Sequence, residues 1–330
     1  MTKSRNQISF LLNDQVTSLD AVPSAMTLLD YLRLEQKLCG TKEGCAEGDC
    51  GACTVLVGRL ADGELIYETV NACIRFVGSL DSCHVVTIEH LKKDDGSLHP
   101  VQQSMVDHHG SQCGFCTPGF VMSLYALWMT IPNPSNAEVE TALQGNLCRC
   151  TGYEPIIKAA QAVSSIDRPE NDPLMLERKT VKKQLEDLRD DSRIEVELDG
   201  DLLIVPANLD DLAEARLSYP DSIIVAGATD VGLWVTKHMR KISPVIFISH
   251  LEELKGIKET DKGLTIGACV TYNELLPVLG DHFPELRGYW NRIGGEQVRN
   301  MGTIGGNVAN GSPIGDTPPV LIALGATVTL

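Results

Sequence analysis

The sequence predicts a multidomain α+β protein, and three observations support this fold class. The chain has 330 residues, which is more than one hydrophobic core usually serves. Ten of its eleven cysteines lie in the first 150 residues, and helix-like segments follow two cysteine pairs. After residue 194 the chain alternates between strand-like and helix-like segments and is rich in glycine. A cysteine-rich region followed by a glycine-rich one indicates separate domains.

The charge balance limits the partners of this protein. Lys plus Arg number 28 and Asp plus Glu number 44, which gives a formal charge of −16. This acidic balance argues against nucleic acid or an anionic membrane as the main partner. The longest nearly apolar run, residues 120–131, is too short to span a bilayer. The first residues contain no apolar signal core, so we expect a cytoplasmic protein.

Cysteine is the most informative residue type in the sequence. An odd number of cysteines without an export signal argues against a disulfide framework. Reduced thiols that are clustered this closely are typical of metal ligands. Iron–sulfur clusters and a zinc ribbon are the two kinds of site to distinguish, and the cysteine spacing decides between them.

The first cysteine set lies in residues 1–88, where we expect short strands and one helix near residues 28–36. Its spacing is C-x4-C-x2-C, then nineteen residues, then a fourth cysteine, which is the plant-type [2Fe–2S] spacing. Glycines between the cysteines let backbone N–H groups turn toward the sulfurs. Zinc ligands usually come as two separated pairs, which this spacing fits poorly. The set consists of Cys45, Cys50, Cys53 and Cys73.

The second cysteine set lies in residues 89–165, which we expect to be mostly helical. Each of its two pairs precedes an apolar helix, with Pro118 and Pro155 in the first turns. Free N–H groups and the positive end of the helix dipole favour an anionic cluster there. On spacing alone, zinc remains an alternative for this set. The set consists of Cys113, Cys116, Cys148 and Cys150.

Residues 166–194 form the predicted linker. Two prolines and a run of alternating charges indicate an irregular connection, with a solvated helix at residues 179–188.

Two glycine-rich segments mark the predicted third domain, residues 195–330. In the first, residues 222–230 form an apolar strand that leads into a small-residue turn, and a helix follows over 231–237. Backbone N–H groups at such a turn can hold a phosphate. The second segment covers residues 294–316. Neither has the G-x-G-x-x-G spacing with a following acidic residue, so the sequence does not support a Rossmann dinucleotide site.

The motifs GCAEGDCGACTV, QCGFCTPGF and GNLCRCTGY resemble the two [2Fe–2S] domains of the molybdenum hydroxylase family. The resemblance implies a β-grasp ferredoxin domain that holds one cluster with the first set. It also implies a four-helix domain that holds the other cluster with the second set. Cys83 is the alternative to Cys73 as the fourth ligand of the first cluster. The cysteines outside the pattern are expected to be small buried apolar residues: Cys39, Cys83 and Cys269.

The third domain resembles the FAD domain of the same family, whose fold is shared with vanillyl-alcohol-oxidase-type flavoproteins. By this resemblance, the first segment lines the FAD pyrophosphate, Ile293 and Gly294 lie near the flavin, and the remaining positions hold the ribityl and phosphate region. The implied FAD residues are Val225, Ala226, Gly227, Ala228, Thr229, Asp230, Val231, Ile293, Gly294, Thr303, Gly306, Asn307, Asn310 and Asp316. The family's flavoprotein unit is longer. We expect residues 318–330 to form a helix and an apolar strand of an FAD domain that is incomplete at its C-terminus.

The resemblance implies the small iron–sulfur and FAD subunit of a bacterial-type xanthine dehydrogenase. In this hypothesis a molybdopterin on a large partner subunit hydroxylates hypoxanthine and xanthine, and electrons pass through two [2Fe–2S] clusters and FAD to NAD+. We expect a hetero-oligomer, a dimer of heterodimers, with no catalytic residue on this chain. Gln112 and Cys150 match positions that contact the pterin edge. The alternatives are the same subunit of an aldehyde or N-heterocycle hydroxylase, and a zinc-binding scaffold.

Overall fold

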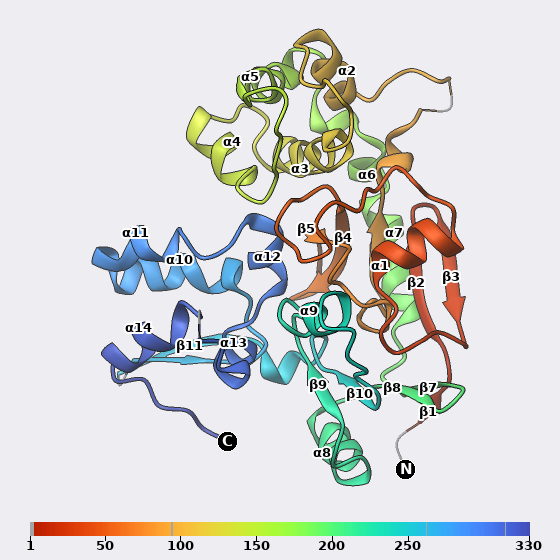
Figure 1. Ribbon diagram of the computed structural model, residues 1–330, viewed down its shortest axis with the longest axis vertical. Coiled ribbons are helices and arrows are strands. Elements are labelled where there is room, and N and C mark those ends of the chain that lie inside the picture. The colour runs from red at the N-terminus through yellow and green to blue at the C-terminus, as the bar shows by residue number, and fades with distance from the viewer. Residues whose placement is uncertain (1–2, 94, 262, 314) are drawn as a thin grey trace.

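The computed structural model describes residues 3–93, 95–261, 263–313 and 315–330. It confirms a multidomain α+β architecture, with two five-stranded sheets, one two-stranded sheet and a group of helices. Figure 1 shows the first sheet beside the second, the helical part at one end of the molecule, and the C-terminal helices on the side away from the first sheet.

The first sheet is mixed and has the strand order β3-β2-β6-β4-β5. The β2–β6 pair is parallel and the other pairs are antiparallel. A short helix follows β3, and its second half is a π-helix over Tyr31–Glu35. The expected helix near residues 28–36 is therefore present. The elements are β2 (Ile8–Leu12), β3 (Gln15–Leu19), α1 (Leu28–Asp30), β4 (Thr54–Ala61), β5 (Glu64–Asn71) and β6 (His84–Val86).

Four helices form the second part, as the sequence predicts. Two begin with a capping box, made by His99 with Gln102 and by Ser135 with Glu138. Proline occupies the first turn of the two helices that follow the cysteine pairs. The helices are α2 (Pro100–Asp107), α3 (Thr117–Thr130), α4 (Asn136–Ala142) and α5 (Glu154–Ala162).

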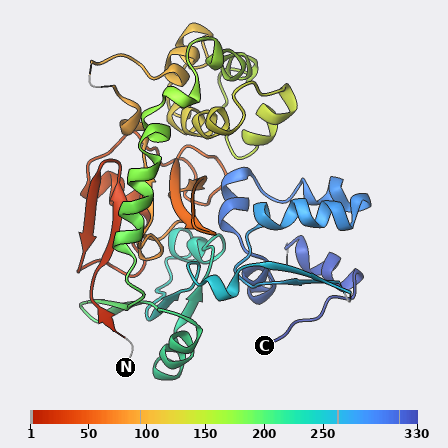
Figure 2. The ribbon, with the colours of Figure 1, turned by 180° about the vertical axis from the view of Figure 1, so that it is seen from behind.

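The connecting segment contains α6 (Pro173–Leu176) and α7 (Arg178–Leu188). The helix expected at residues 179–188 is present, but the expectation that it is solvated is wrong. Val181 and Leu185 are buried in a cluster with Leu11 and Leu65 of the first sheet. Figure 2 shows α7 running along the face of that sheet. The reason is that this charged helix still carries an apolar stripe at i, i+4 spacing.

A buried carboxylate attaches the start of this segment to the helical part. Asp172 is 4% exposed and accepts hydrogen bonds from Tyr125 Oη at 2.6 Å and from its own cap partner Leu174 N at 2.9 Å. Its Oδ2 lies 2.8 Å from His99 Nε2. Because His99 Nδ1 accepts from Val101 N, Nε2 carries the proton and donates to Asp172.

The second sheet has the order β1-β7-β8-β10-β9. Its outer strand β1 comes from the N-terminus and pairs with β7 in parallel, Ser4 opposite Arg193 and Arg5 opposite Ile194. The strands of the third part are β1 (Ser4–Arg5), β7 (Arg193–Leu198), β8 (Asp201–Val205), β9 (Ile223–Val225), β10 (Val245–Phe247), β11 (Ile257–Thr260) and β12 (Gly263–Ile266). Its helices are α8 (Leu209–Ser218), α9 (Val231–Thr236), α10 (Tyr272–His282), α11 (Arg287–Trp290), α12 (Glu296–Met301), α13 (Ile304–Asn310) and α14 (Thr317–Ala323).

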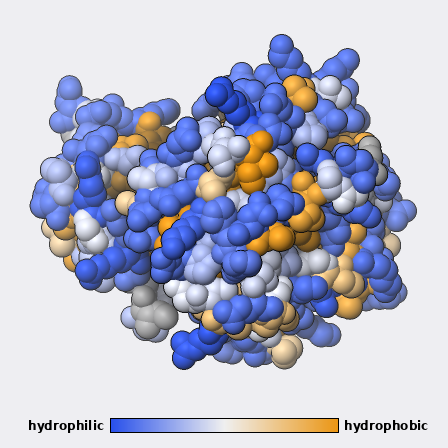
Figure 3. Space-filling view, turned by 90° about the horizontal axis from the view of Figure 1, so that it is seen from above, coloured by the Kyte–Doolittle hydropathy of each residue, from blue (hydrophilic) through white to orange (hydrophobic). Residues whose placement is uncertain are grey.

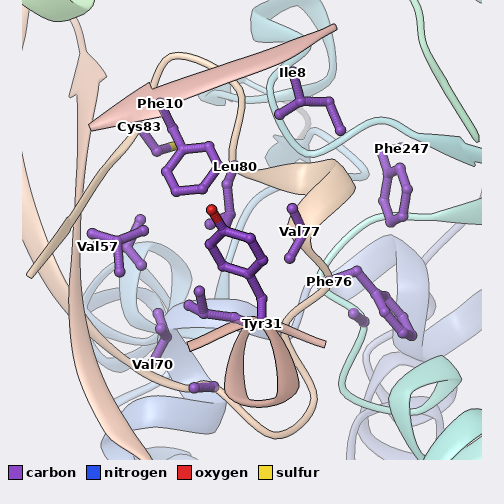
Figure 4. Close-up of a cluster of buried hydrophobic side chains, with 14 of the residues drawn as sticks. Ile8, Phe10, Tyr31, Val57, Val70, Phe76, Val77, Leu80, Cys83 and Phe247 are labelled. Atoms are coloured by element: carbon purple, nitrogen blue, oxygen red, sulfur yellow. The ribbon is translucent and has the colours of Figure 1, made fainter. Parts of the chain in front are cut away.

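One hydrophobic core joins the first and third parts. Figure 4 shows Tyr31 pointing toward Phe10, and Phe247 of β10 beside Phe76. The ring centroids of each pair are 6.0 Å apart. Phe247 also covers Gly78, where an added Cβ would lie 2.3 Å from the ring. These two parts are therefore held together by a shared, closely packed interior rather than by surface contacts.

The C-terminal residues differ from the expectation. The expected helix is present as α14, but residues 326–330 form no strand and are exposed. No strand of the described residues lies alongside to accept their backbone hydrogen bonds, so an apolar sequence alone does not make a strand here. None of the described helices is long and apolar enough to cross a membrane.

Candidate iron–sulfur and flavin sites

The first cysteine set is brought together by the loop before β4 and by the end of β5. Cys45 Sγ contacts Cys50 and Cys73, and Cys53 contacts Cys73. Cys53 and Cys73 are each 2% exposed, while Cys45 and Cys50 are half-buried. The N–H groups of Glu47 and Cys50 point at Cys45 Sγ, each at 3.4 Å. The loop therefore turns backbone donors toward sulfur, as an anionic cluster requires.

The pKa is lowered for two thiols of this set and raised for the other two. Hydrogen bonds from Cys50 and Cys73 lower the pKa of Cys45, and the hydrogen bond with Cys73 lowers that of Cys53. In return the contact with Cys45 raises the pKa of Cys73, and likewise that of Cys50. Cys45 and Cys53 therefore ionise most readily, and a thiolate is the form that binds a metal.

The alternative ligand Cys83 lies away from this set. It is buried, and its Sγ donates to Asp81 O at 3.6 Å. Burial raises its pKa, and its nearest charges are those of Arg75 and Asp81. It lines a cavity of about 120 Å³ between the first and third parts, which Cys269 also lines. The structure therefore places Cys73, and not Cys83, beside the other three cysteines.

Two of the three cysteines outside the sets follow the sequence prediction. Cys83 and Cys269 are 8% and 2% exposed. The prediction is wrong for Cys39, which is exposed. It lies in an irregular loop, where the side chains of Arg33 and Lys42 donate to its carbonyl oxygen. The loop leaves its own side chain exposed.

The second cysteine set joins the start of α3 to the loop before α5. Cys113 contacts Cys150, and Cys116 contacts Cys148. Cys116 is the residue at the N-terminal cap of α3, as expected for a thiol near free N–H groups. Burial and the neighbouring Cys148 raise the pKa of Cys116 to about 12. Cys113 and Cys150 are exposed, whereas Cys148 is buried.

The pairing of thiols bears on the kind of metal centre. Within the described ranges, no group of three or more His, Cys, Asp or Glu side chains is placed to hold a metal ion. In the second set the thiols approach in pairs, Cys113 with Cys150 and Cys116 with Cys148. In a [2Fe–2S] cluster each iron takes two of the four thiolates, so two neighbouring thiol pairs fit that donor set.

The two cysteine sets are in direct backbone contact. Leu147 N, next to Cys148, donates to Cys50 O at 2.9 Å. Gly119, in the first turn of α3, lies so close to the first loop that an added Cβ would be 2.1 Å from Gly51 O. The loops that would hold the two clusters therefore fix each other's position.

Two buried asparagines support these loops, and the sequence analysis missed them. Asn71 Nδ2 donates to Gly48 O at 2.7 Å, and Asn146 Nδ2 donates to Gly51 O at 3.3 Å. Each asparagine precedes a cysteine of its set by two residues, Cys73 and Cys148. The repeated Asn-x-Cys pattern was therefore a readable signal for residues that hold the loop of the first set.

The two glycine-rich segments of the third part lie against each other. Gly227, in the turn after β9, is so close to the residues before α13 that an added Cβ would be 1.7 Å from Met301 O. Ala228 adopts a positive φ of 64° in the same turn. Asp230 is hydrogen-bonded to Asn310, and burial raises the pKa of this carboxyl group. Thr303 Oγ1 accepts from Gly306 N and so begins α13. Several of the FAD residues implied by the resemblance, including Gly227, Asp230 and Asn310, thus come together from both segments.

One unsatisfied polar atom supports a ligand at this place. Asn307 Oδ1 is buried and has no hydrogen-bond partner among the described residues. A buried carbonyl oxygen without a partner costs about 1–3 kcal/mol, and a ribityl hydroxyl of a bound FAD would satisfy it. The turn at residues 225–231, together with Thr303 and Asn307, therefore fits the ribityl and phosphate region of FAD.

The remaining implied FAD positions are more scattered. Ile293 is 6% exposed and belongs to the core cluster that contains Trp290 and Ile304. Gly294 is exposed with a φ of 57°. Asp316 is exposed, and its backbone oxygen accepts from Tyr289 Oη at 2.5 Å. The structure does not bring these three into the turn that follows β9.

The helix after the first glycine-rich turn contacts the first cysteine loop. Lys237, directly after α9, donates to Cys45 O and lies 3.5 Å from the Glu47 carboxylate. Gly232 of α9 packs on Ile74, next to Cys73. The candidate flavin site is therefore adjacent to the first cysteine set.

The second cysteine set faces solvent instead. Gln112, Cys113 and Cys150 are exposed. Phe115 and Leu147, beside them in sequence, are 48% and 51% exposed. Figure 3 looks down on the end of the molecule that carries the helical part and shows hydrophobic patches on an otherwise hydrophilic face.

Comparisons with known proteins agree with this division of sites. Residues 10–77 match the 2Fe-2S iron-sulfur cluster binding domain, residues 87–161 the [2Fe-2S] binding domain, and residues 195–330 the FAD binding domain in molybdopterin dehydrogenase. These matches define a redox protein with two iron–sulfur domains and a flavin domain.

The chain belongs to the molybdenum hydroxylase family, as its iron–sulfur and FAD portion. It is 34% identical to the xanthine dehydrogenase of Drosophila subobscura over 97% of this chain and 27% of that protein. It is 32% identical to the xanthine dehydrogenase/oxidase of Gallus gallus over 98% and 29%. The chain thus spans between a quarter and a third of these relatives.

Among solved structures, the quinoline 2-oxidoreductase of Pseudomonas putida 86 is 33% identical over 55% of this chain and 96% of the matched chain. Its TM-score of 0.40 is too low to support an inference.

Proposed function

We propose that this chain is the electron-transfer subunit of a xanthine dehydrogenase. It passes electrons from a molybdenum cofactor on a large partner subunit through two [2Fe–2S] clusters to FAD and then to NAD+. Cys113, Cys116, Cys148 and Cys150 hold the cluster that receives the electrons, and Cys45, Cys50, Cys53 and Cys73 hold the one that delivers them to FAD. The cofactors supply the redox chemistry when bound, and the chain supplies their placement.

The order of the three sites carries this proposal. The second cysteine set is exposed at Cys113 and Cys150, it contacts the first set through Leu147 and Cys50, and the first set contacts α9 beside the candidate flavin turn. Electrons that enter at the surface near Gln112 would therefore meet the sites in a single sequence.

Exposed apolar side chains support an interface around the second set. Phe115 and Leu147 give the exposed rim an apolar character, and the core of a permanent hetero-complex interface is typically apolar. We propose that a molybdopterin-binding subunit covers this surface and brings the pterin edge to Gln112 and Cys150. The assembly would be a dimer of heterodimers in the cytoplasm.

We also propose domain folds and boundaries. The mixed first sheet with a helix across it supports a β-grasp ferredoxin domain in residues 1–88. The four helices support a cluster-binding domain in 89–165, which the segment 166–194 joins to a vanillyl-alcohol-oxidase-like FAD domain in 195–330.

The test is reconstitution with a molybdenum subunit. The chain, completed by any segment that follows it in its natural protein, should bind about four irons and four sulfides by count of two clusters, and acid should release FAD from it. Xanthine-dependent NAD+ reduction should require the partner. Stoichiometric zinc in a colourless protein, or xanthine turnover without the partner, would refute the proposal.

The same preparation distinguishes the alternative substrate class. Turnover of aldehydes or N-heterocycles in place of xanthine would assign the complex to another molybdenum hydroxylase while leaving the electron-transfer role of this chain intact.

A further inference from the structure

The three parts of the molecule meet at α12. Figure 1 shows this helix between the first sheet, the helical part and the rest of the third part. It begins two residues after Gly294, and its last residue, Met301, touches Gly227. Its inward side chains are therefore placed to set the distances among all three candidate redox sites.

Gln297 of α12 has no exposed surface. Its Nε2 lies 3.0 Å from Thr54 Oγ1, 3.2 Å from Ser123 Oγ and 2.9 Å from Asn146 Oδ1. Thr54 begins β4 directly after Cys53, Ser123 lies on α3, and Asn146 precedes Cys148 by two residues. A single carboxamide of the third part thus contacts Thr54 and Asn146, which lie next to cysteines of the two sets.

The orientation of this carboxamide follows from its partners. Thr54 Oγ1 donates its proton to Gly51 O at 2.6 Å, and Ser123 Oγ donates to Asn146 Oδ1 at 2.8 Å. Because both hydroxyl protons are already used, these oxygens can only accept from Gln297. The amide nitrogen must therefore point toward them.

The carboxamide of Gln297 is closely packed on its oxygen side. An added Cβ on Gly145 would lie 1.9 Å from Gln297 Oε1. That oxygen is buried and has no partner among the described residues. Leaving this oxygen unpaired costs free energy. The cost arises because the carboxamide places its nitrogen among three acceptors.

We propose that Gln297 is a positioning residue for electron transfer. Its carboxamide fixes the loop of Cys50–Cys53 against the loop of Cys148, and fixes both against the flavin segment. The inference rests on the proposed function. The transfer concerned moves one electron at a time from the second cluster to the first and then to FAD, without making or breaking a bond.

The test compares Gln297→Met with Asn300→Ala in the complex with the molybdenum subunit. Methionine has a similar shape but cannot donate. Asn300 is the matched control, because it is also buried on α12 but donates only to Thr69 of the first sheet, at 2.9 Å and 3.2 Å. In Gln297→Met, exchange of the Leu147 amide, which donates to Cys50 O, should accelerate roughly tenfold. Substrate-driven flavin reduction should slow by a similar factor, with iron content unchanged. In Asn300→Ala both should keep their original rates.

The outcomes separate the two hypotheses. Unchanged exchange and unchanged flavin reduction in Gln297→Met, or equal effects of both substitutions, would overturn the role of Gln297. A wild-type chain without iron would refute the proposed function, while amide exchange would still report on the junction. If Gln297→Met does not fold, Ser123→Ala removes one acceptor and should accelerate the same amide, and failure to do so overturns the proposal.

Discussion

Replacing Gly119 by alanine tests the contact between the two cysteine loops. The new Cβ would lie 2.1 Å from Gly51 O, whereas ordinary contact begins at 3.4 Å, so the loops must separate by 3.4 − 2.1 = 1.3 Å. The obstacle is a backbone carbonyl and cannot rotate away. Overpacking of this kind costs about 1–3 kcal/mol, and the better helix propensity of alanine returns at most about 1 kcal/mol. We expect a net loss of about 1–2 kcal/mol.

Urea unfolding, followed by circular dichroism and by cluster absorbance, measures this loss. Gly288→Ala is the control, because Gly288 is also helical, has nothing within 4 Å of its added Cβ and should become more stable by about 0.5–1 kcal/mol. If Gly119→Ala is stabilised as much as Gly288→Ala, the close contact between α3 and the first cysteine loop is absent and the reasoning is wrong.

Three further predictions follow from buried groups. Cys73→Ser should lower the iron content from about four to about two per chain, whereas Cys83→Ser should leave it unchanged; the reverse result would exchange the two assignments. Burial lowers the pKa of His84 to about 4 from 6.5, and the neutral ring accepts from Tyr67 Oη and donates to Asn13 O. Because the unfolded state takes up the proton first, up to about 3 kcal/mol of stability should be lost as the pH falls from 6.5 to 4, and His84→Gln should flatten this dependence in acid titrations of unfolding. Phe247→Ala should cost about 3–5 kcal/mol, and calorimetry should show the first and third parts melting in one transition; two separated transitions would contradict the shared core.

The closely spaced cysteines within each set could be predicted from sequence because their geometry is local. Loops of a few residues place Cys45, Cys50 and Cys53 near one another whatever surrounds them. Cys73 comes from the far end of a hairpin, and spacing could not separate it from Cys83. Only the pairing of β4 with β5 brings Cys73 to the other three.

The errors have a different origin. The burial of α7 depends on a sheet that forms more than a hundred residues earlier, so its charged sequence suggested a solvated helix. Residues 326–330 have strand-like composition but no neighbouring strand. Gln297 lies in a segment that the sequence analysis assigned to FAD, and its role depends on two other domains. Long-range contacts of this kind leave no periodicity in the sequence.

The pairing of β1 with β7 affects the time course of synthesis. Arg193, the partner of Ser4, is made 189 residues later, after the iron–sulfur region. At about 5–20 residues per second, the ribosome needs roughly 10–40 s to supply it. During that interval Arg5 can reach Asp81 but not Asp190. The strand β1 therefore has no partner strand until β7 is made, and the second sheet is completed only after both cysteine sets have been translated.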